Sequence, residues 1–169
     1  VTLSSKMSGT FNSFSQAAKQ FDNISVVDSK RNSGAQGFIV SEIAKRLDSG
    51  VSIQNTLADV DKIILSKKIY VMVDNFSAML RSGRVSKAKA FIANMINFKP
   101  IVGIDDAGAG VLLSKCLSRR AQLEYLLKQL NEINTMKPIR GFHTLYVDNQ
   151  EEAVTLDKKI SDILNIKSY

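Results

Sequence analysis

Apolar and polar residues follow one another along the chain in a pattern that predicts short strands alternating with amphipathic helices. The apolar start, residues 1–3, leads into a run of small hydroxyl residues and a glycine, and residues 11–21 then carry apolar side chains at helical spacing. A strand, a tight turn and a helix are expected in that order. The apolar run 24–27, which ends in Asp28-Ser29, is typical of a buried strand.

Two further helices are expected before the middle of the chain. Asn32 and Ser33 are suited to begin one that stops near Gly50, and Ser52 opens another whose apolar face continues to Ile64. Strands that alternate with helices in this way predict an α/β region with parallel pairing.

The pattern changes after Lys68 and favours an antiparallel sheet with helices packed on it. The expected elements are a strand at 69–73, a short helix near 76–80, a helix opened by Ser86, two strands at 100–104 and 110–113 joined by a hairpin at 105–108, a helix at 118–134, a strand at 142–147 and a final helix at 149–164. The predicted fold class is therefore α/β plus α+β. A parallel-sheet α/β domain covers residues 1–67, an α+β domain covers residues 68–169, and the boundary falls near residues 66 to 68.

The hydroxyl-rich turn before the first helix is the most informative local feature. A strand that turns into a helix presents unpaired backbone N–H groups and the positive end of the helix dipole. With the hydroxyls of Ser8 and Thr10 beside them, such a junction suits a carboxylate or a phosphate. The alternative is an ordinary helix cap, because Ser and Thr are common capping residues.

Composition narrows the class of protein. With 44% hydrophobic residues, no 18-residue apolar run and no signal-peptide pattern, we expect a cytoplasmic protein without an integral membrane segment. The single cysteine, Cys116, provides no disulfide framework and no zinc site by itself, and we expect it to be a small buried side chain. The net charge of +7 is spread over both halves of the chain. No long basic run with interleaved aromatics indicates nucleic acid, although some of the charge suits an acidic or phosphorylated partner.

Other candidate chemistry is weak. Residues 33–37 resemble a phosphate loop only loosely, because the Lys-Ser/Thr ending is missing. His143 is the only histidine and has no partners for a catalytic triad in the pattern. Asp105 and Asp106 fit a metal site less well than a turn. We therefore expect a non-catalytic protein without a metal or a cofactor.

Four blocks of sequence, in order along the chain, resemble motifs of the DegV family of bacterial fatty-acid-binding proteins, which have the EDD fold. They are Ser4-Ser5-Lys6-Met7-Ser8-Gly9-Thr10-Phe11, Val26-Val27-Asp28-Ser29, Leu80-Arg81-Ser82-Gly83-Arg84-Val85 and Asn97-Phe98-Lys99-Pro100-Ile101. The glycines at positions 34, 37 and 50 also fall where the family has glycines.

The resemblance implies a lipid carrier. Proteins of this family bind one long-chain fatty acid between an α/β and an α+β domain, and some present its carboxylate to a fatty-acid kinase. By motif, Ser8 would hold the carboxylate, and Gly9 and Thr10 would provide close backbone approach and a second hydroxyl. The expected ligand is a palmitate-like fatty acid, and the expected partner is a fatty-acid kinase.

Further residues are candidates for contacts with the ligand or the partner. Arg84 either meets an anionic ligand or partner or holds a loop by bonding carbonyl groups, and Lys99 has the same two alternatives. Four aromatic side chains either line an acyl slot or belong to an ordinary core, and these are Phe11, Phe14, Phe38 and Phe91.

The chain also departs from the family pattern. It starts at the strand before the Ser-Gly-Thr turn, without the family's Thr-Ser-x-Pro-Ser loop, and it ends before the family's Gly-Thr-His-x-Gly-Pro-Gly segment. Cys116 stands where the family has an arginine. The resemblance therefore implies a partial chain whose parallel-sheet α/β domain, residues 1–67, is truncated. One alternative is a divergent or truncated interaction domain that has lost ligand binding, and another is an enzyme acting on a phosphorylated small molecule at Ser8.

Overall fold

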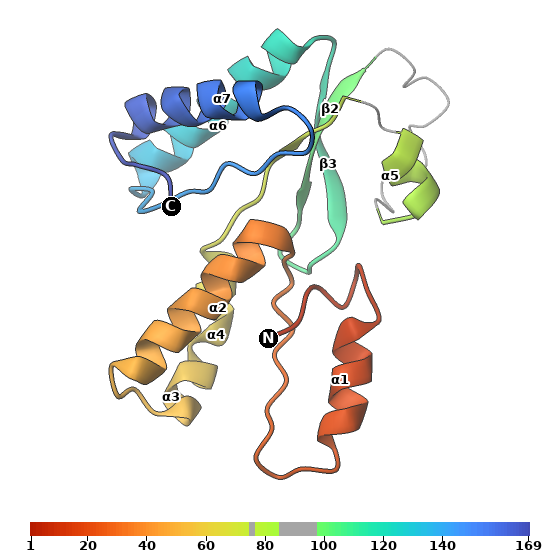
Figure 1. Ribbon diagram of the computed structural model, residues 1–169, viewed down its shortest axis with the longest axis vertical. Helices are drawn as coiled ribbons and strands as arrows, with labels where there is room; N and C mark the ends of the chain where they lie inside the picture. Colours follow the sequence, from red (N-terminus) through yellow and green to blue (C-terminus); the bar gives the residue numbers. More distant parts are fainter. Residues whose placement is uncertain (75–76, 85–97) are drawn as a thin grey trace. The chain divides into compact units, whose positions relative to one another are not determined.

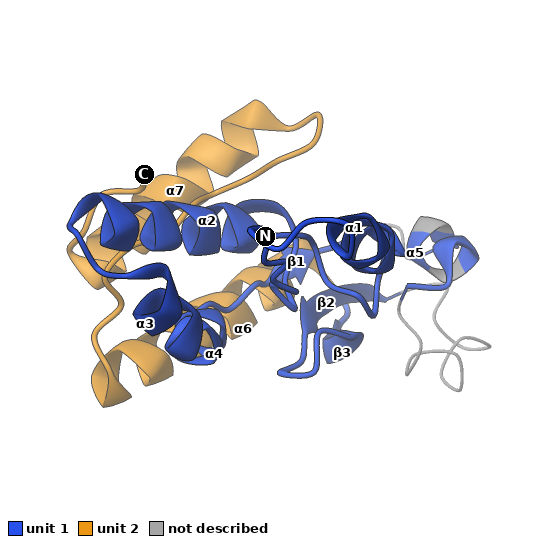
Figure 2. Ribbon diagram, turned by 90° about the horizontal axis from the view of Figure 1, so that it is seen from below, with its two compact units in different colours: residues 1–117 blue, residues 118–169 orange. Residues whose placement is uncertain are grey.

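The computed structural model describes residues 1–74, 77–84 and 98–169. The chain divides into two compact units, Val1–Leu117 and Ser118–Tyr169, which are coloured separately in Figure 2. The predicted boundary near residues 66 to 68 separates two kinds of secondary structure and not these compact units, so it stays a prediction. The helix expected from Ser86 lies outside the described residues.

The first unit opens with two extended segments that lie parallel. Thr2 forms a parallel bridge with Asp28, in which the Thr2 N–H donates to the Val27 carbonyl at 2.8 Å and the Ser29 N–H donates to the Thr2 carbonyl at 3.1 Å. The predicted parallel pairing is present here as this one bridge. Between the two segments runs helix α1, Thr10–Ala18, which buries none of its residues.

Three helices build the apolar core at this end of the unit. Helix α2, Ser33–Asp48, packs against α3, Ile53–Ala58, and α4, Val60–Leu65 (Figure 1). The core consists of buried isoleucines at positions 39, 63 and 64. The single helix expected from Ser52 to Ile64 is interrupted at Asp59, whose carboxylate binds Arg46 at 3.0 Å and Lys62 at 2.8 Å.

A three-stranded antiparallel sheet follows, as predicted. Its strands are β1, Val71–Met72, β2, Lys99–Ile104, and β3, Gly110–Cys116, in the order β1-β2-β3. The short helix α5, Ser77–Ser82, precedes β2. Val102 is buried in the sheet, where Val73, Met79, Phe98 and Leu112 pack against it. Cys116 at the end of β3 is free and buried, as expected.

The second unit contains two helices, α6, Arg119–Met136, and α7, Gln150–Leu164, which pack on each other. Ser118 and Asn149 cap them through their side chains. An ion pair between Arg119 and Glu152 joins their first turns.

The strand expected at 142–147 is wrong. This segment forms no strand, and the Phe142 carbonyl instead accepts a hydrogen bond from the N–H of Tyr169 at 3.1 Å. Across the described residues the chain is a mixed α/β fold, and no helix there is both long enough and apolar enough to span a bilayer.

Candidate functional site

The turn at residues 4–10 places two hydroxyl groups side by side ahead of α1. The Ser8 Oγ and Thr10 Oγ1 atoms are 2.8 Å apart, and the Thr10 N–H donates to Ser8 Oγ at 3.3 Å. Both side chains are half-buried, whereas Gly9 between them is exposed. The pair can therefore donate to an anion that approaches from solvent.

The first turn of α1 adds unpaired backbone donors. The N-cap residue Gly9 has no side chain to cap this helix, the Ser8 hydroxyl accepts from only the first backbone N–H of the helix, and the first turn has no acidic residue. The first bond into the helix is from the Ser13 N–H to the Gly9 carbonyl at 3.0 Å. Within the described residues nothing accepts from the N–H groups of Phe11 and Asn12, so the positive end of the helix dipole remains free for a negative group.

Gly9 leaves open space at this point. Its φ of −71° suits any residue, and a Cβ atom built on it would meet nothing within 4 Å. Neither strain nor packing within the described chain therefore requires a glycine at position 9. Close approach of another molecule is a remaining reason for a residue without a side chain.

Asp28 and Ser4 fix the shape of the turn. One carboxylate oxygen of Asp28 accepts from the N–H groups of Ser5 at 3.2 Å and Lys30 at 2.9 Å. The Ser4 carbonyl accepts from the N–H groups of Met7 at 3.0 Å and Ser8 at 3.1 Å. These four bonds hold the hydroxyl pair in place relative to the extended segment that precedes α2.

The hairpin between β2 and β3 is docked on this turn. The fully buried Ser4 hydroxyl donates to the Gly108 carbonyl at 2.6 Å. Gly108 has a φ of +90°, and a Cβ atom there would lie 2.5 Å from Ser4 Oγ. Only glycine fits this contact without a shift of the neighbouring atoms. The sequence indicated a hairpin but gave no sign of the contact.

Arg31 ties the same region together from inside. Its side chain is 0% exposed and donates to the carbonyl groups of Lys67 at 2.9 Å, Lys30 at 2.7 Å and Asp105 at 3.0 Å. Burial lowers the pKa of the Arg31 guanidinium, and the charges of Asp106 and Asp105 oppose this shift. Arg31 thus joins the extended segment before α2 to the start of the sheet and to the hairpin.

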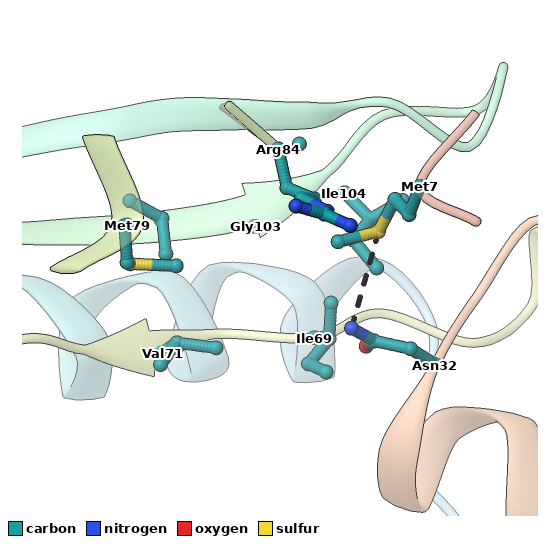
Figure 3. Close-up of a pocket in the computed structure, with 10 residues that line it drawn as sticks. Met7, Asn32, Ile69, Val71, Met79, Arg84, Gly103 and Ile104 are labelled. Atoms are coloured by element: carbon teal, nitrogen blue, oxygen red, sulfur yellow. Dashed lines mark hydrogen bonds between the residues drawn. The ribbon is translucent and has the colours of Figure 1, made fainter. Parts of the chain in front are cut away.

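An apolar pocket lies between the turn and the sheet, entirely within the first unit (Figure 3). It has a volume of about 50 Å³ and is lined by Met7, Asn32, Ile69, Val71, Met79, Arg84, Val102, Gly103, Ile104 and Gly110. Pockets that enclose a small-molecule ligand usually measure about 300 Å³ or more. The pocket can therefore hold only part of a long acyl chain.

The structure places the predicted contact residues in different surroundings. Arg84 lines the pocket and also donates to the Ser82 carbonyl at 2.5 Å, so it has features of both alternatives. Lys99 forms an ion pair with Asp74 at 2.8 Å.

The predicted aromatic residues do not line this pocket. Phe11 and Phe38 are half-buried elsewhere, Phe14 is 59% exposed, and Phe91 lies outside the described residues. Their assignment to an acyl slot stays a prediction.

The remaining chemical candidates have structural partners. One carboxylate oxygen of Asp105 accepts from the N–H groups of Ala107 at 3.1 Å and Ala109 at 2.9 Å and so shapes the hairpin turn. The Nδ1 atom of His143 lies 3.0 Å from the carbonyl oxygen of Tyr169. In the part of the chain that the structure describes, no group of His, Cys, Asp and Glu side chains could hold a metal ion.

Comparison with protein families gives one match over the whole chain. The family model described as "Uncharacterised protein, DegV family" covers residues 1–169. A DegV domain-containing protein of Staphylococcus aureus (strain N315) is 26% identical over 170 residues, which represent 100% of this chain and 61% of that relative.

Solved structures give the same result. The crystal structure of DegV from Bacillus subtilis, described as a fatty acid binding protein, matches with a TM-score of 0.86 at 27% identity, over 99% of this chain and 60% of that one. A DegV lipid binding protein of Thermotoga maritima matches with a TM-score of 0.77 at 27% identity, over 95% of this chain and 56% of that one. The chain thus spans about 60% of the length of the relatives that it matches.

Proposed function

The chain belongs to the DegV family, and on this premise we propose that it binds a long-chain fatty acid. The carboxylate is held at the Ser8–Thr10 turn, and the hydrocarbon tail is buried among apolar side chains. The Bacillus subtilis relative is described as a fatty acid binding protein. Because this chain spans only about 60% of the length of its relatives, fatty-acid binding by this chain is a proposal.

One observation carries the proposal: the turn that holds the hydroxyl pair adjoins an apolar pocket. The hydroxyl pair of Ser8 and Thr10 lies at the uncapped end of α1. Met7, the residue directly before Ser8, lines the pocket. A molecule with a negative head and an apolar tail is the ligand class that satisfies both features at once.

The energetics fit such a ligand. Burying each methylene group contributes about 0.8 kcal/mol, so a tail of about fourteen methylenes contributes on the order of 11 kcal/mol before ordering costs are subtracted. The hydroxyls therefore orient the acid, whereas the tail provides most of the affinity.

We further propose that the protein is a non-catalytic cytoplasmic carrier that presents the carboxylate to a fatty-acid kinase. Gly9 is exposed and has open space where a side chain would be, so a head group at Ser8 is within reach of a second protein. In the test, purified kinase, ATP and fatty acid are combined with and without this protein. Acyl phosphate is expected only in its presence, and equal formation without it contradicts the carrier role.

The binding proposal is tested with the purified protein and the Ser8→Ala variant. Native mass spectrometry is expected to show a copurifying fatty acid of sixteen to eighteen carbons in the wild type. The variant is expected to bind palmitate about tenfold more weakly, because it loses a hydrogen bond to a charged group. Ser13→Ala is the control. The Ser13 hydroxyl is exposed, lies farther along α1 than the hydroxyl pair and donates to the Gly9 carbonyl. Unchanged palmitate affinity in Ser8→Ala contradicts the assignment of Ser8.

The small pocket volume supports a second candidate function. Within the described residues, the pocket of about 50 Å³ does not enclose a whole fatty acid, which agrees with a divergent interaction domain that has lost its ligand. A protein that carries no fatty acid after purification, and binds none when palmitate is added, but still binds a kinase supports this second candidate over the first.

A further inference from the structure

The side chain of Asn32 is the clearest unsatisfied polar group at the pocket. Asn32 occupies the N-cap position of α2, where asparagine usually accepts a hydrogen bond from the first turn, yet its side chain makes no capping bond. Its Oδ1 atom is buried and has no hydrogen-bond partner. Its Nδ2 atom faces the thioether sulfur of Met7 at 3.9 Å, which is a weak acceptor.

A buried carbonyl oxygen without a hydrogen-bond donor is unfavourable, because it has lost its hydrogen bonds to water and gained nothing in exchange. Such groups in folded proteins call for an explanation, and a bound molecule is one. Three other side chains have a buried polar atom without a hydrogen bond, namely Arg31, Thr56 and Thr144. Asn32 differs from them because it alone among the four lines the pocket.

Asn32 lies at one end of the pocket, which we call the polar end. Figure 3 shows Met7 and Asn32 at this end of the view, Val71 and Met79 at the other, and Arg84 between them. The Arg84 side chain has no carboxylate partner within the described residues. Since Met7 directly precedes Ser8 in the chain, the polar end is the end that adjoins the hydroxyl turn.

We infer that Asn32 is a contact for the head group of the bound acid and makes the site prefer a free acid to an uncharged lipid. The inference rests on the proposed function. The carboxamide donates an N–H to a carboxylate oxygen at the polar end of the pocket. In the structure the buried, unpaired atom is the acceptor Oδ1, which cannot bind a carboxylate. Rotation of the carboxamide by half a turn brings Nδ2 to that position, where its N–H donates to the carboxylate, and gives up the weak contact with the Met7 sulfur.

The test compares two ligands of equal chain length, palmitic acid and hexadecanol, on three proteins: the wild type, Asn32→Leu and Asn32→Asp. Leucine has a similar size and no polar atoms, whereas aspartate has the same shape but repels a carboxylate. At pH 8, Asn32→Leu is expected to bind palmitate about tenfold more weakly, and Asn32→Asp more weakly still. Both variants are expected to bind hexadecanol within about threefold of the wild type.

Thr56→Val is the matched control. Thr56 is 1% exposed and its Oγ1 atom is also buried without a partner, but it does not line the pocket. This variant and Asn32→Leu are both expected to keep or raise the melting temperature of the ligand-free protein, because each replaces an unsatisfied polar group by an apolar one. Only Asn32→Leu is expected to lose affinity for palmitate.

Equal losses for palmitate and hexadecanol would mean that Asn32 only shapes the pocket and would overturn the inference. Unchanged palmitate affinity in both Asn32 variants would also overturn the inference. The proposed function would still stand if the wild type binds palmitate and Ser8→Ala binds it more weakly. A wild-type protein that binds neither ligand contradicts both.

Discussion

Helices α1 and α2 have the same kind of sequence pattern but differ in how much of each helix is buried. Both carry apolar residues at helical spacing. α2 buries Ala35 and Ile39 and packs against α3 and α4, whereas α1 buries none of its nine residues and leaves Phe14 59% exposed. An apolar face thus predicts that a helix forms without telling what covers that face.

The two helices therefore differ in the property that they are expected to determine. α2 belongs to the core that stabilises the first unit, and the extended segment before it is anchored to the hairpin by Arg31. α1 begins at the hydroxyl pair and presents its face to solvent. Substitutions in α2 and its anchor should therefore change stability, while substitutions in α1 should change ligand binding.

The largest expected effect is on the α2 side. Ile39 is 0% exposed and belongs to the cluster with Ile63 and Ile64. We expect Ile39→Ala to lower the free energy of unfolding by about 4 kcal/mol, because it removes buried methyl groups and leaves a cavity. Urea denaturation measures this loss. Val40→Ala on the neighbouring position, 44% exposed, should change the same quantity by about 0.5 kcal/mol or less.

A smaller loss is expected at the anchor. Arg31→Met retains much of the volume but leaves the carbonyl groups of Lys30, Lys67 and Asp105 without their donor. We expect a loss of about 2–3 kcal/mol, roughly one for each hydrogen bond. Arg46→Met removes a partly exposed ion pair with Asp59 and should cost about 1 kcal/mol or less. Equal losses in the two variants would show that Arg31 is no anchor.

Hydrogen exchange adds a local measurement to the Arg31 comparison. We expect the N–H groups of Asp105 and Gly108 in the hairpin to exchange faster in Arg31→Met, because the Arg31 guanidinium donates to the Asp105 carbonyl. If these two amides exchange as slowly as in the wild type, the loss of stability in Arg31→Met arises from contacts other than the one with the hairpin.

Most helices and the hairpin could be predicted because their signals are local. Ser118 and Asn149 cap α6 and α7, and Asp105 and Gly108 shape the hairpin turn. The break at Asp59 could not be predicted, because it accompanies an ion pair with Arg46, thirteen residues away. The strand expected at 142–147 had strand-like composition, but a strand also needs a partner, and this segment bonds the C-terminal residue instead.

The site shows the same limit. Ser8, Gly9 and Thr10 could be proposed from the sequence because the turn and the helix start are local features and because the segment resembles a motif of the DegV family. Asn32 was expected only to begin a helix, and its place at the pocket depends on strands that lie about 70 residues further along the chain. The bond from Ser4 to Gly108 spans 104 residues. Contacts of this separation leave no mark in periodicity or spacing.

The smallest expected change in stability belongs to α1. Phe14→Ala should alter the free energy of unfolding by about 0.5 kcal/mol or less, because the ring is 59% exposed. If the tail of the acid lies against this face, palmitate affinity should fall about fivefold, which corresponds to about 1 kcal/mol of lost burial. Phe21→Ala is the control, since Phe21 is similarly exposed but lies beyond the end of α1. Equal palmitate affinity in Phe14→Ala and the wild type would show that the acyl tail does not lie against α1. The helix would then contribute to binding only through the hydroxyl pair at its N-terminal end.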